Sequence, residues 1–277
     1  MTAETIALAP YVGGALGASG VAVAAAGRRE LRARWCSWLG TAAVIGVVSW
    51  LGSLGWLALS VTLGAVAALE YARLRGLAGP ERLILIAAAM TLPTIAYGSP
   101  EHLLTALLVL PWLFVFPSVM VADPTAAPRQ ARDALFGLML LTGLLGFVLL
   151  PPLVVVTAAL AVSLGDIAAW AGGRLLGRRW PRQLSSLSPN KTVIGMVTGV
   201  LVSLAVVLFV GAVTSTALPL GLLVAVALGA PFGDLVESQL KREAGVKDAG
   251  QWLPGFGGLL DRVDSLLPVL TLALVLS

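Results

Sequence analysis

Charge is scarce in this sequence, and so are cysteine and lysine. Charged residues make up 12% of the 277 residues, whereas hydrophobic residues make up 58%, more than the roughly one half that is usual in soluble domains. Together with a mean hydropathy of +0.95, this excludes an ordinary soluble domain. The single cysteine, Cys36, excludes a disulfide within the chain.

Long apolar runs take the place of the missing charge. A helix that crosses a bilayer needs about 20 apolar residues. Such runs lie at 5–27, 36–53, 55–72, 83–97, 103–122, 134–150, 152–171, 192–212, 216–236 and 263–277. Two still longer runs are divided here at Gly52–Gly55 and at Pro151–Pro152. The sequence therefore predicts an all-α, polytopic integral membrane protein with about nine or ten transmembrane helices.

The basic residues are distributed unevenly between the loops. All 18 lysines and arginines fall near 28–35, 73–82, 123–133, 172–191 and 237–262, and the intervening loops hold none. These five segments alternate with the basic-free loops, as expected when positive charge is retained on the cytoplasmic side. We therefore expect a multi-pass protein of the inner or plasma membrane whose basic loops, and any site built on them, face the cytoplasm. The net charge of +4 is a topology signal and is no indication of nucleic-acid binding.

No obvious linker divides the chain. We expect a single membrane unit in which residues 1–150 form amino-terminal transmembrane helices and residues 151–277 form a carboxy-terminal transmembrane region. The two longest cytoplasmic loops, 172–191 and 237–262, belong to this second region and are where soluble chemistry can be held.

Three acidic residues lie where an apolar environment makes them costly. Glu70 ends the third predicted span, Asp166 lies inside the seventh, and Asp234 lies inside the ninth. An ionisable side chain at such a depth usually faces a water-filled cavity or a partner. The alternative is that each lies near a cytoplasmic helix end and extends back to water.

Asp234 begins a polar helix face. If the ninth span continues as a helix, Asp234, Glu237, Ser238 and Lys241 follow at i, i+3, i+4 and i+7 and share one side. A carboxylate at membrane depth, followed by a hydroxyl and an ammonium group, favours a site for a metal and a phosphate. The alternative is an ordinary amphipathic helix exit in which Glu237 and Lys241 form an i, i+4 ion pair.

The three lysines are confined to the two longest loops. Lys191, Lys241 and Lys247 lie there, whereas the other cytoplasmic loops use arginine alone. A compact ammonium group suits a phosphate, so the pattern favours phosphate binding over a purely topological role. Chance placement of three residues is the competing explanation.

The segment SLSPNKTVIG, residues 186–195, precedes the eighth span. Ser188 before Pro189 predicts a helix N-cap with proline at the first helical position, which places Lys191 and Thr192 in the first turn. A helix N-terminus favours an anion, and a lysine is unfavourable there unless an anion lies nearby.

The segment PGFGGLLDRVDS, residues 254–265, has a similar character. Its glycines allow backbone N–H groups to line a nest for a phosphate. Asp261 and Asp264 follow three residues apart, and with Asp234 from another helix they predict a site for a divalent cation. The alternative is a glycine-rich turn followed by acids that cap a helix, since such a turn alone is weak support for a site.

These motifs resemble the carboxy-terminal signature of the phosphatidate cytidylyltransferases, also called CDP-diacylglycerol synthases. The matching residues are Gly233, Asp234, Glu237, Ser238, Lys241, Arg242, Lys247, Asp248, Pro254, Gly255, Gly257, Gly258, Asp261, Arg262 and Asp264. The segments GDIAAWAGGRLLGRR, SPNKTVIG and LEYARL resemble further segments of the family. The strong resemblance covers about residues 160–277, and the first half matches mainly in hydropathy.

The resemblance implies a Mg²⁺-dependent nucleotidyltransferase of phospholipid biosynthesis. Such an enzyme transfers a cytidylyl group from CTP to phosphatidic acid, giving CDP-diacylglycerol and pyrophosphate, and it works as a homodimer among membrane lipids. The implied metal ligands are Asp234 and Asp261, followed by Asp264, Asp248 and Asp166, with a second cation as an option. The implied catalytic residues are Lys241, Arg242, Lys247, Asp248 and Arg262, and the implied substrate-binding residues are Ser188, Lys191, Thr192, Ser238, Gly255, Gly257 and Gly258.

Three positions depart from the family pattern. Phe256 stands where the family has histidine, Ile194 where it has glutamate, and Trp170 where it has tyrosine. Phenylalanine can neither relay a proton nor hydrogen-bond a phosphate. The departures therefore leave open a catalytically degenerate paralogue that binds lipid or nucleotide. A second alternative is a CTP-dependent polyprenol or phytol kinase, since such enzymes share parts of the acidic motif. A transporter is disfavoured, because paired acids are lacking in several mid-membrane helices.

Overall fold

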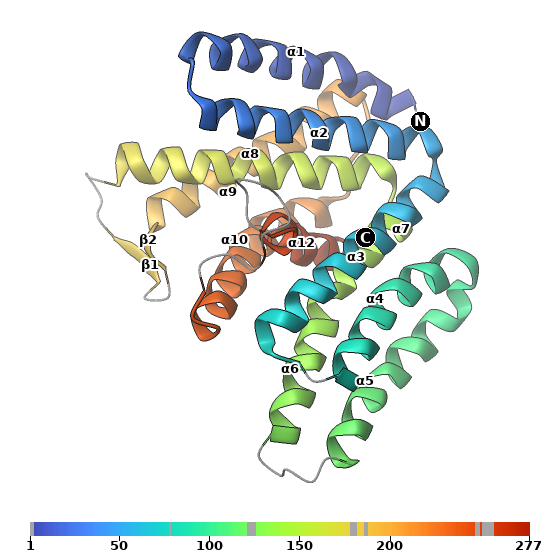
Figure 1. The fold of residues 1–277 in the computed structure, drawn as a ribbon. Helices are drawn as coiled ribbons and strands as arrows, with labels where there is room; N and C mark the ends of the chain where they lie inside the picture. The colour runs from blue at the N-terminus through green and yellow to red at the C-terminus, as the bar shows by residue number, and fades with distance from the viewer. Residues whose placement is uncertain are drawn as a thin grey trace.

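A computed structural model describes residues 3–77, 79–120, 126–177, 182–185, 188–246, 250 and 258–277. Within these ranges the chain is almost entirely helical (Figure 1). The long helices are α1 (Ala3–Ala26), α2 (Arg29–Leu51), α3 (Ser53–Arg75), α4 (Gly79–Gly98), α5 (Leu103–Met120), α6 (Ala126–Leu141), α8 (Pro152–Leu176), α9 (Val193–Thr214) and α10 (Leu220–Glu243). The short helical elements are η1 (Pro100–His102), η2 (Thr142–Leu145), α7 (Gly146–Leu149), α11 (Leu260–Val263) and α12 (Leu266–Val275).

Seven helices within the described ranges are long and apolar enough to cross a membrane. They are Glu4–Ala26, Ser53–Arg75, Pro100–Pro117, Pro128–Leu149, Pro152–Leu176, Val193–Thr214 and Leu220–Glu243. Helices α2 and α4 are 23 and 20 residues long, and α12 is a shorter apolar helix of 10 residues. Each predicted apolar run falls on helical structure, and the predicted class of polytopic, all-α membrane protein is confirmed.

The two longest apolar runs are interrupted where the sequence predicts. Gly52 separates α2 from α3 with a φ of 69°, a left-handed conformation that glycine adopts at no steric cost. Leu150 is extended after α7, and Pro152 begins α8 because its fixed φ suits the first helical turn. Gly52 in the first run and residues 150–152 in the second therefore divide the two long apolar stretches.

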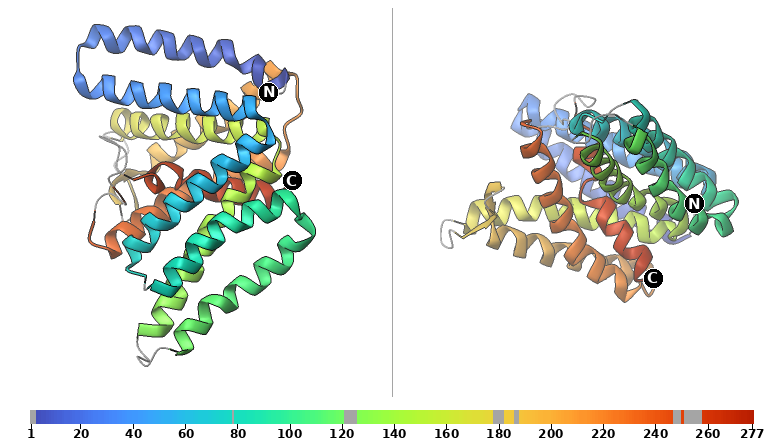
Figure 2. Two further views of the ribbon diagram at one scale, coloured as in Figure 1. Left: turned by 45° about the vertical axis from the view of Figure 1, so that its right-hand side comes forward. Right: turned by 90° about the horizontal axis from the view of Figure 1, so that it is seen from below.

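The helices form two outer groups around a central one (Figures 1 and 2). Helices α1 and α2 form a hairpin on one side of the molecule, and α4, α5 and α6 lie on the other. Helices α3, α10 and α12 lie between them. The most extensive helix pairs are α8 with α9, α10 with α12, and α3 with α4. One large cluster of buried side chains draws residues from α3, α4, α8, α10 and α12, so the two halves of the chain share a core.

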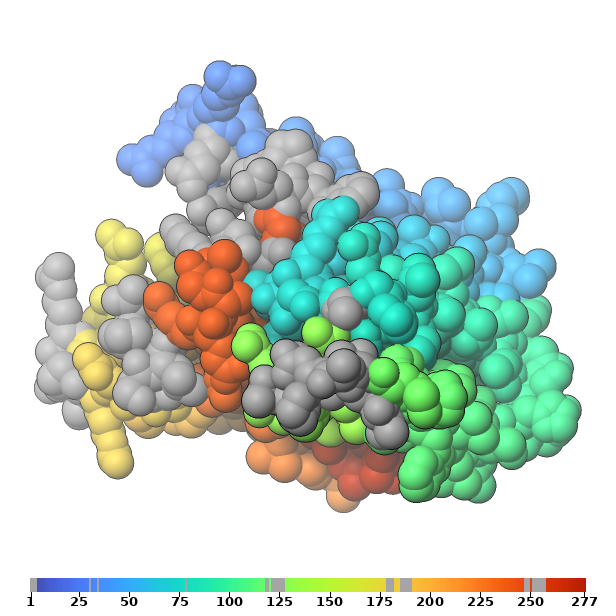
Figure 3. Space-filling model, turned by 60° about the horizontal axis from the view of Figure 1, so that its bottom comes forward, coloured from blue at the N-terminus to red at the C-terminus, as the bar shows by residue number. Residues whose placement is uncertain are grey.

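An ion-pair network joins the carboxyl ends of α3 and α10 to the middle of α6. The guanidinium of Arg75 contacts Asp133 Oδ1 at 2.9 Å and also contacts Glu243. Asp133 is buried, and a buried carboxylate needs such a partner because it has lost its water. Figure 3 shows this end of the molecule, where α10 in orange-red lies against α3 in cyan. The network brings the carboxyl ends of α3 and α10 together.

The expected helix start at Ser188 is wrong. Strand β2 (Ser188–Thr192) pairs antiparallel with β1 (Gln183–Ser185), and Gln183 lies opposite Thr192. The helix α9 instead begins at Val193, with Thr192 as its N-cap: the Thr192 hydroxyl accepts the Gly195 N–H at 3.1 Å. Backbone pairing with β1 holds residues 188–192 extended, so the capping role passes to the next hydroxyl along the chain.

A close approach between the two halves yields a first prediction. Gly143 of η2 lies against the backbone of Leu267 of α12, and an added Cβ would overlap the Leu267 carbonyl oxygen. We expect Gly143→Ala to lower the free energy of unfolding by about 1–3 kcal/mol, because overpacking forces the backbone apart. Thermal unfolding in detergent measures this. The control is Gly46→Ala, on α2, where a Cβ meets nothing within 4 Å; equal melting temperatures for the two variants would contradict the packing described here.

Candidate active site

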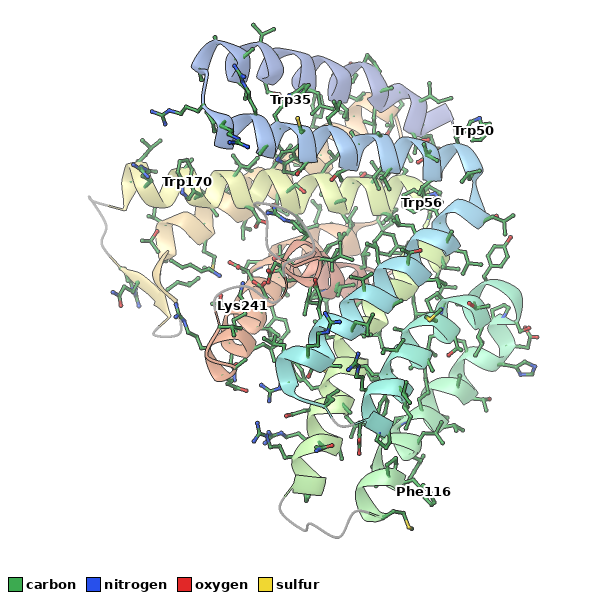
Figure 4. The ribbon with its side chains drawn as sticks, viewed as in Figure 1. Trp35, Trp50, Trp56, Phe116, Trp170 and Lys241 are labelled. Atoms are coloured by element: carbon green, nitrogen blue, oxygen red, sulfur yellow. The ribbon has the colours of Figure 1, made fainter. Side chains whose placement is uncertain are left out.

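One face of α10 carries the polar residues that the sequence places together. The helix continues to Glu243, so the condition for a shared face at Asp234, Glu237, Ser238 and Lys241 is met. Glu237 is buried, and the other three side chains are partly buried. Figure 4 labels Lys241 on α10, and its ammonium group contacts Asp261 of α11. The face is therefore turned into the protein, unlike that of an ordinary amphipathic helix exit.

Three carboxylates converge beside this face. Asp234, Glu237 and Asp264 each offer an oxygen, and these oxygens lie within 4.8 Å of one another. Asp264 comes from the turn between α11 and α12 and is buried, as Glu237 is. Carboxylates at this spacing repel one another unless a cation or protons neutralise them. An all-oxygen donor set of this kind fits a hard divalent cation.

Lys191 connects the β-hairpin to α10. Its Nζ forms a salt bridge with Asp234 Oδ1 at 2.5 Å, and it donates hydrogen bonds to the Asp234 carbonyl oxygen at 3.2 Å and to Ser238 Oγ at 3.0 Å. The N-cap at Thr192 fixes the adjacent backbone. Lys191 therefore lies directly against one of the three converging carboxylates, although it is in a strand rather than in a helical turn.

Lys241 connects α10 to α11. Its Nζ lies 2.7 Å from Glu237 Oε1 and 3.4 Å from Asp261 Oδ1. The other oxygen of Asp261 accepts the Gly258 N–H at 2.8 Å, a local bond that fixes the side chain at the start of α11. The ammonium group thus bridges the carboxylates of two helices.

Two of the three main predicted metal ligands, Asp234 and Asp264, lie in one group with Glu237. The third, Asp261, lies beside this group: it contacts Glu237 and Lys241 and accepts the Gly258 N–H. Asp166 lies on α8 and is not part of the group of three converging carboxylates. Glu237 was visible in the sequence as the i+3 neighbour of Asp234, but its i, i+4 pairing with Lys241 gave it an ordinary structural explanation.

The remaining predicted residues are only partly covered by the structure. Arg242 and Arg262 are exposed, and Gly258 is buried. The backbone of Ser188 begins β2. The predicted residues that lie outside the described ones are Lys247, Asp248, Gly255 and Gly257, together with the departure Phe256. Their roles, like those of the other site residues, stay predictions.

The two other departures lie on α9 and α8. Ile194 is half-buried in the first turn of α9. Trp170 is exposed on α8, where the guanidinium carbon of Arg174 lies 5.5 Å from the centre of its ring (Figure 4). Trp170 thus has a cation–π partner of its own on the surface of α8.

Glu70 is the residue whose place the sequence did not reveal. Its side chain on α3 is buried, and its two carboxylate oxygens accept the backbone N–H groups of Leu259 at 3.0 Å and Leu260 at 2.6 Å. The sequence marks Glu70 as an acid at the end of an apolar span, but both partners are about 190 residues further along the chain.

Comparison with known proteins adds three relatives and a family. Residues 32–277 match the cytidylyltransferase family. A phosphatidate cytidylyltransferase of Helicobacter pylori strain J99 is 38% identical over 191 residues, which cover 68% of this chain and 62% of that protein. The enzyme of the same name from Staphylococcus saprophyticus is 46% identical over 125 residues, which cover 43% of this chain and 46% of that protein. The one from Staphylococcus aureus strain COL is 41% identical over 129 residues, which cover 43% of this chain and 48% of that protein. The matched stretch thus spans less than two thirds of each of these relatives.

The place of Glu237 in the carboxylate cluster leads to a prediction about cation binding. We expect Glu237→Gln to weaken Mn²⁺ binding to the purified protein about tenfold or more, because it removes a charged oxygen ligand. Electron paramagnetic resonance counts free Mn²⁺ directly. The matched control is Glu243→Gln, which removes a carboxylate on the same helix that pairs with Arg75 instead. Equal affinities in the Glu237→Gln variant and the parent would remove Glu237 from the cation site.

Proposed function

The chain belongs to the cytidylyltransferase family, and from this membership we propose that it transfers the cytidylyl group of CTP to phosphatidic acid, giving CDP-diacylglycerol and pyrophosphate. The observation that carries the proposal is the convergence of Asp234, Glu237 and Asp264 between two lysines, Lys191 and Lys241. The names of the three relatives support the choice of substrates.

This arrangement suits the chemistry of cytidylyl transfer. An oxygen of the lipid phosphate attacks the α-phosphorus of CTP, a new P–O bond forms, and the bond to the bridging oxygen breaks as pyrophosphate leaves. The nucleophile already carries negative charge, so the protein needs no nucleophile of its own. Positioning and charge neutralisation are what the site must supply.

The residues present divide this work between carboxylates and ammonium groups. Asp234, Glu237 and Asp264 fit a divalent cation, which we propose to be Mg²⁺, and such an ion when bound would neutralise triphosphate charge. Lys191 and Lys241 already lie against these carboxylates and present N–H donors beside them. We propose that both lysines also contact substrate phosphates, because an ammonium group suits a phosphate oxygen. Ser238 would orient a phosphate through its hydroxyl.

The membrane setting explains the position of the site. The protein is a multi-pass membrane protein, and the carboxylates lie near the end of α10, where a lipid phosphate and a soluble nucleotide can both arrive. We propose that this end faces the cytoplasm, in the inner or plasma membrane, because the basic loops lie on the same side. We also propose that the enzyme acts as a homodimer and that residues 151–277 form its catalytic region.

The activity is tested by incubating purified protein with CTP, phosphatidic acid and Mg²⁺ and identifying the products. We expect CDP-diacylglycerol and pyrophosphate to form in equal amounts. Asp261→Asn is expected to abolish turnover, because it removes a carboxylate of the signature that contacts Lys241. In a parallel incubation that supplies a polyprenol or phytol in place of phosphatidic acid, release of CDP together with the phosphorylated alcohol would instead identify a polyprenol or phytol kinase.

The same assay also tests whether the departures from the family pattern at Phe256 and Ile194 have made the protein catalytically inactive. A parent protein that binds CTP but gives no product, and that gains turnover through Phe256→His, is a degenerate paralogue rather than an active enzyme. Turnover by the unmodified parent excludes that alternative.

The proposed orientation is tested by labelling single cysteines. In a Cys36→Ser background, we expect Glu101→Cys to react with a membrane-impermeant maleimide added to intact cells, whereas Arg129→Cys reacts only after the membrane is opened. Both side chains are well exposed, at 66% and 71%. The reverse pattern would place the basic loops, and the site, on the opposite face.

A further inference from the structure

Helix α3 contributes no predicted ligand, yet its Glu70 is bonded to the start of α11. Both oxygens of the buried Glu70 carboxylate are used, one on the Leu259 N–H at 3.0 Å and one on the Leu260 N–H at 2.6 Å. Hydrogen bonds to an ionised carboxylate are among the stronger ones in proteins, and two on adjacent amides fix an orientation as well as a distance. The beginning of α11 is therefore attached to α3.

The backbone around this carboxylate leaves it little freedom. A Cβ added to Gly258 would lie 2.8 Å from Glu70 Oε2 and 2.7 Å from the Gly250 nitrogen, and a Cβ on Gly250 would overlap Glu70 Oε1. Two glycines thus allow the chain to pass directly over the carboxylate, at positions where any side chain would push it away. The close approach restricts where α11 can lie.

The attachment is adjacent in sequence to the site residues. Asp261 follows Leu260 directly, and Asp264 lies three residues, or about one helical turn, beyond Asp261. Asp261 also accepts the Gly258 N–H, so the same short segment that is bonded to Glu70 orients the Asp261 side chain. On the other side, Gly233 of α10 packs against the backbone of Asp264 and Ser265. The turn that carries Asp264 is thus held between α3 and α10.

We propose that Glu70 is a positioning residue for the cation site: it holds the start of α11 so that Asp264 meets Asp234 and Glu237, and Asp261 meets Lys241. This inference rests on the proposed cation site. It assigns to the first half of the chain a share in forming that site. Groups that orient metal ligands from outside the coordination shell typically change metal affinity by about 10–100-fold when they are removed.

The test is a titration of the protein, in nanodiscs and without nucleotide, with Mn²⁺. Electron paramagnetic resonance measures the free Mn²⁺ at each step and so gives the Kd. We expect Glu70→Gln to raise the Kd for Mn²⁺ at least about tenfold, because an amide offers one acceptor oxygen for two backbone N–H groups. Ser60→Ala is the matched control: it removes a buried hydrogen bond, to the Leu144 carbonyl oxygen at 2.8 Å, from the same helix ten residues away. It is expected to leave the Kd unchanged.

Two results would overturn the inference. Glu70→Gln with the parent's Kd shows that the position of Asp264 does not depend on Glu70. Equal weakening by Ser60→Ala shows a general loss of packing instead of positioning. If Glu70→Gln does not fold, Glu70→Asp is measured in the same way; it keeps the charge but is one methylene shorter, so an intermediate Kd supports positioning and the parent's Kd contradicts it.

Mn²⁺ binding and product formation by the parent protein show whether a negative result contradicts the positioning role of Glu70 or the proposed function. A parent that binds no Mn²⁺ overturns the cation site and this inference together. A parent that binds Mn²⁺ and makes CDP-diacylglycerol, with no effect of Glu70→Gln on either, overturns the positioning role alone.

Discussion

A carboxylate inside an apolar helical bundle must find a hydrogen-bond donor or a cation, and in this protein that requirement determines which segments meet. Glu70 accepts two backbone N–H groups from the start of α11, Asp133 pairs with Arg75, and Glu237 pairs with Lys241. An unpaired carboxylate at such a position would cost several kcal/mol. Each pair joins elements that hydropathy alone would leave free to pack in other ways, so the polar contacts specify the arrangement while apolar burial supplies the main driving force.

The same contacts explain why the site needs both halves of the chain. Asp234 and Glu237 come from α10, Asp264 from the turn before α12, and Lys191 from the β-hairpin before α9. Helix α3 belongs to the first half, but it contacts the beginning of α11 through Glu70 and the end of α10 through Arg75. The amino-terminal helices therefore do more than anchor the protein in the bilayer.

The parts of this structure that depend on local pattern were predictable, and those that depend on distant contacts were not. Apolar run length located the helices, Gly52 and Pro152 marked the breaks, and the spacing from Asp234 to Lys241 gave the polar face of α10. The Ser188–Pro189 pair carries a valid local signal for a helix start, but pairing with β1 overrides it. Which of Asp261 and Asp264 faces Asp234 depends on a short turn held by Glu70, whose partners lie about 190 residues away, and no local pattern encodes that contact.

The central claim is that the cation lies among Asp234, Glu237 and Asp264. A structure of the protein in lipid with Mn²⁺ and CTP, with anomalous scattering recorded at the manganese edge, tests it most directly. The account predicts an anomalous peak within about 2.0–2.6 Å of oxygens from these residues, as expected for an ion with carboxylate ligands. A peak bound elsewhere on the chain, or CTP bound with no manganese at these carboxylates, would contradict it.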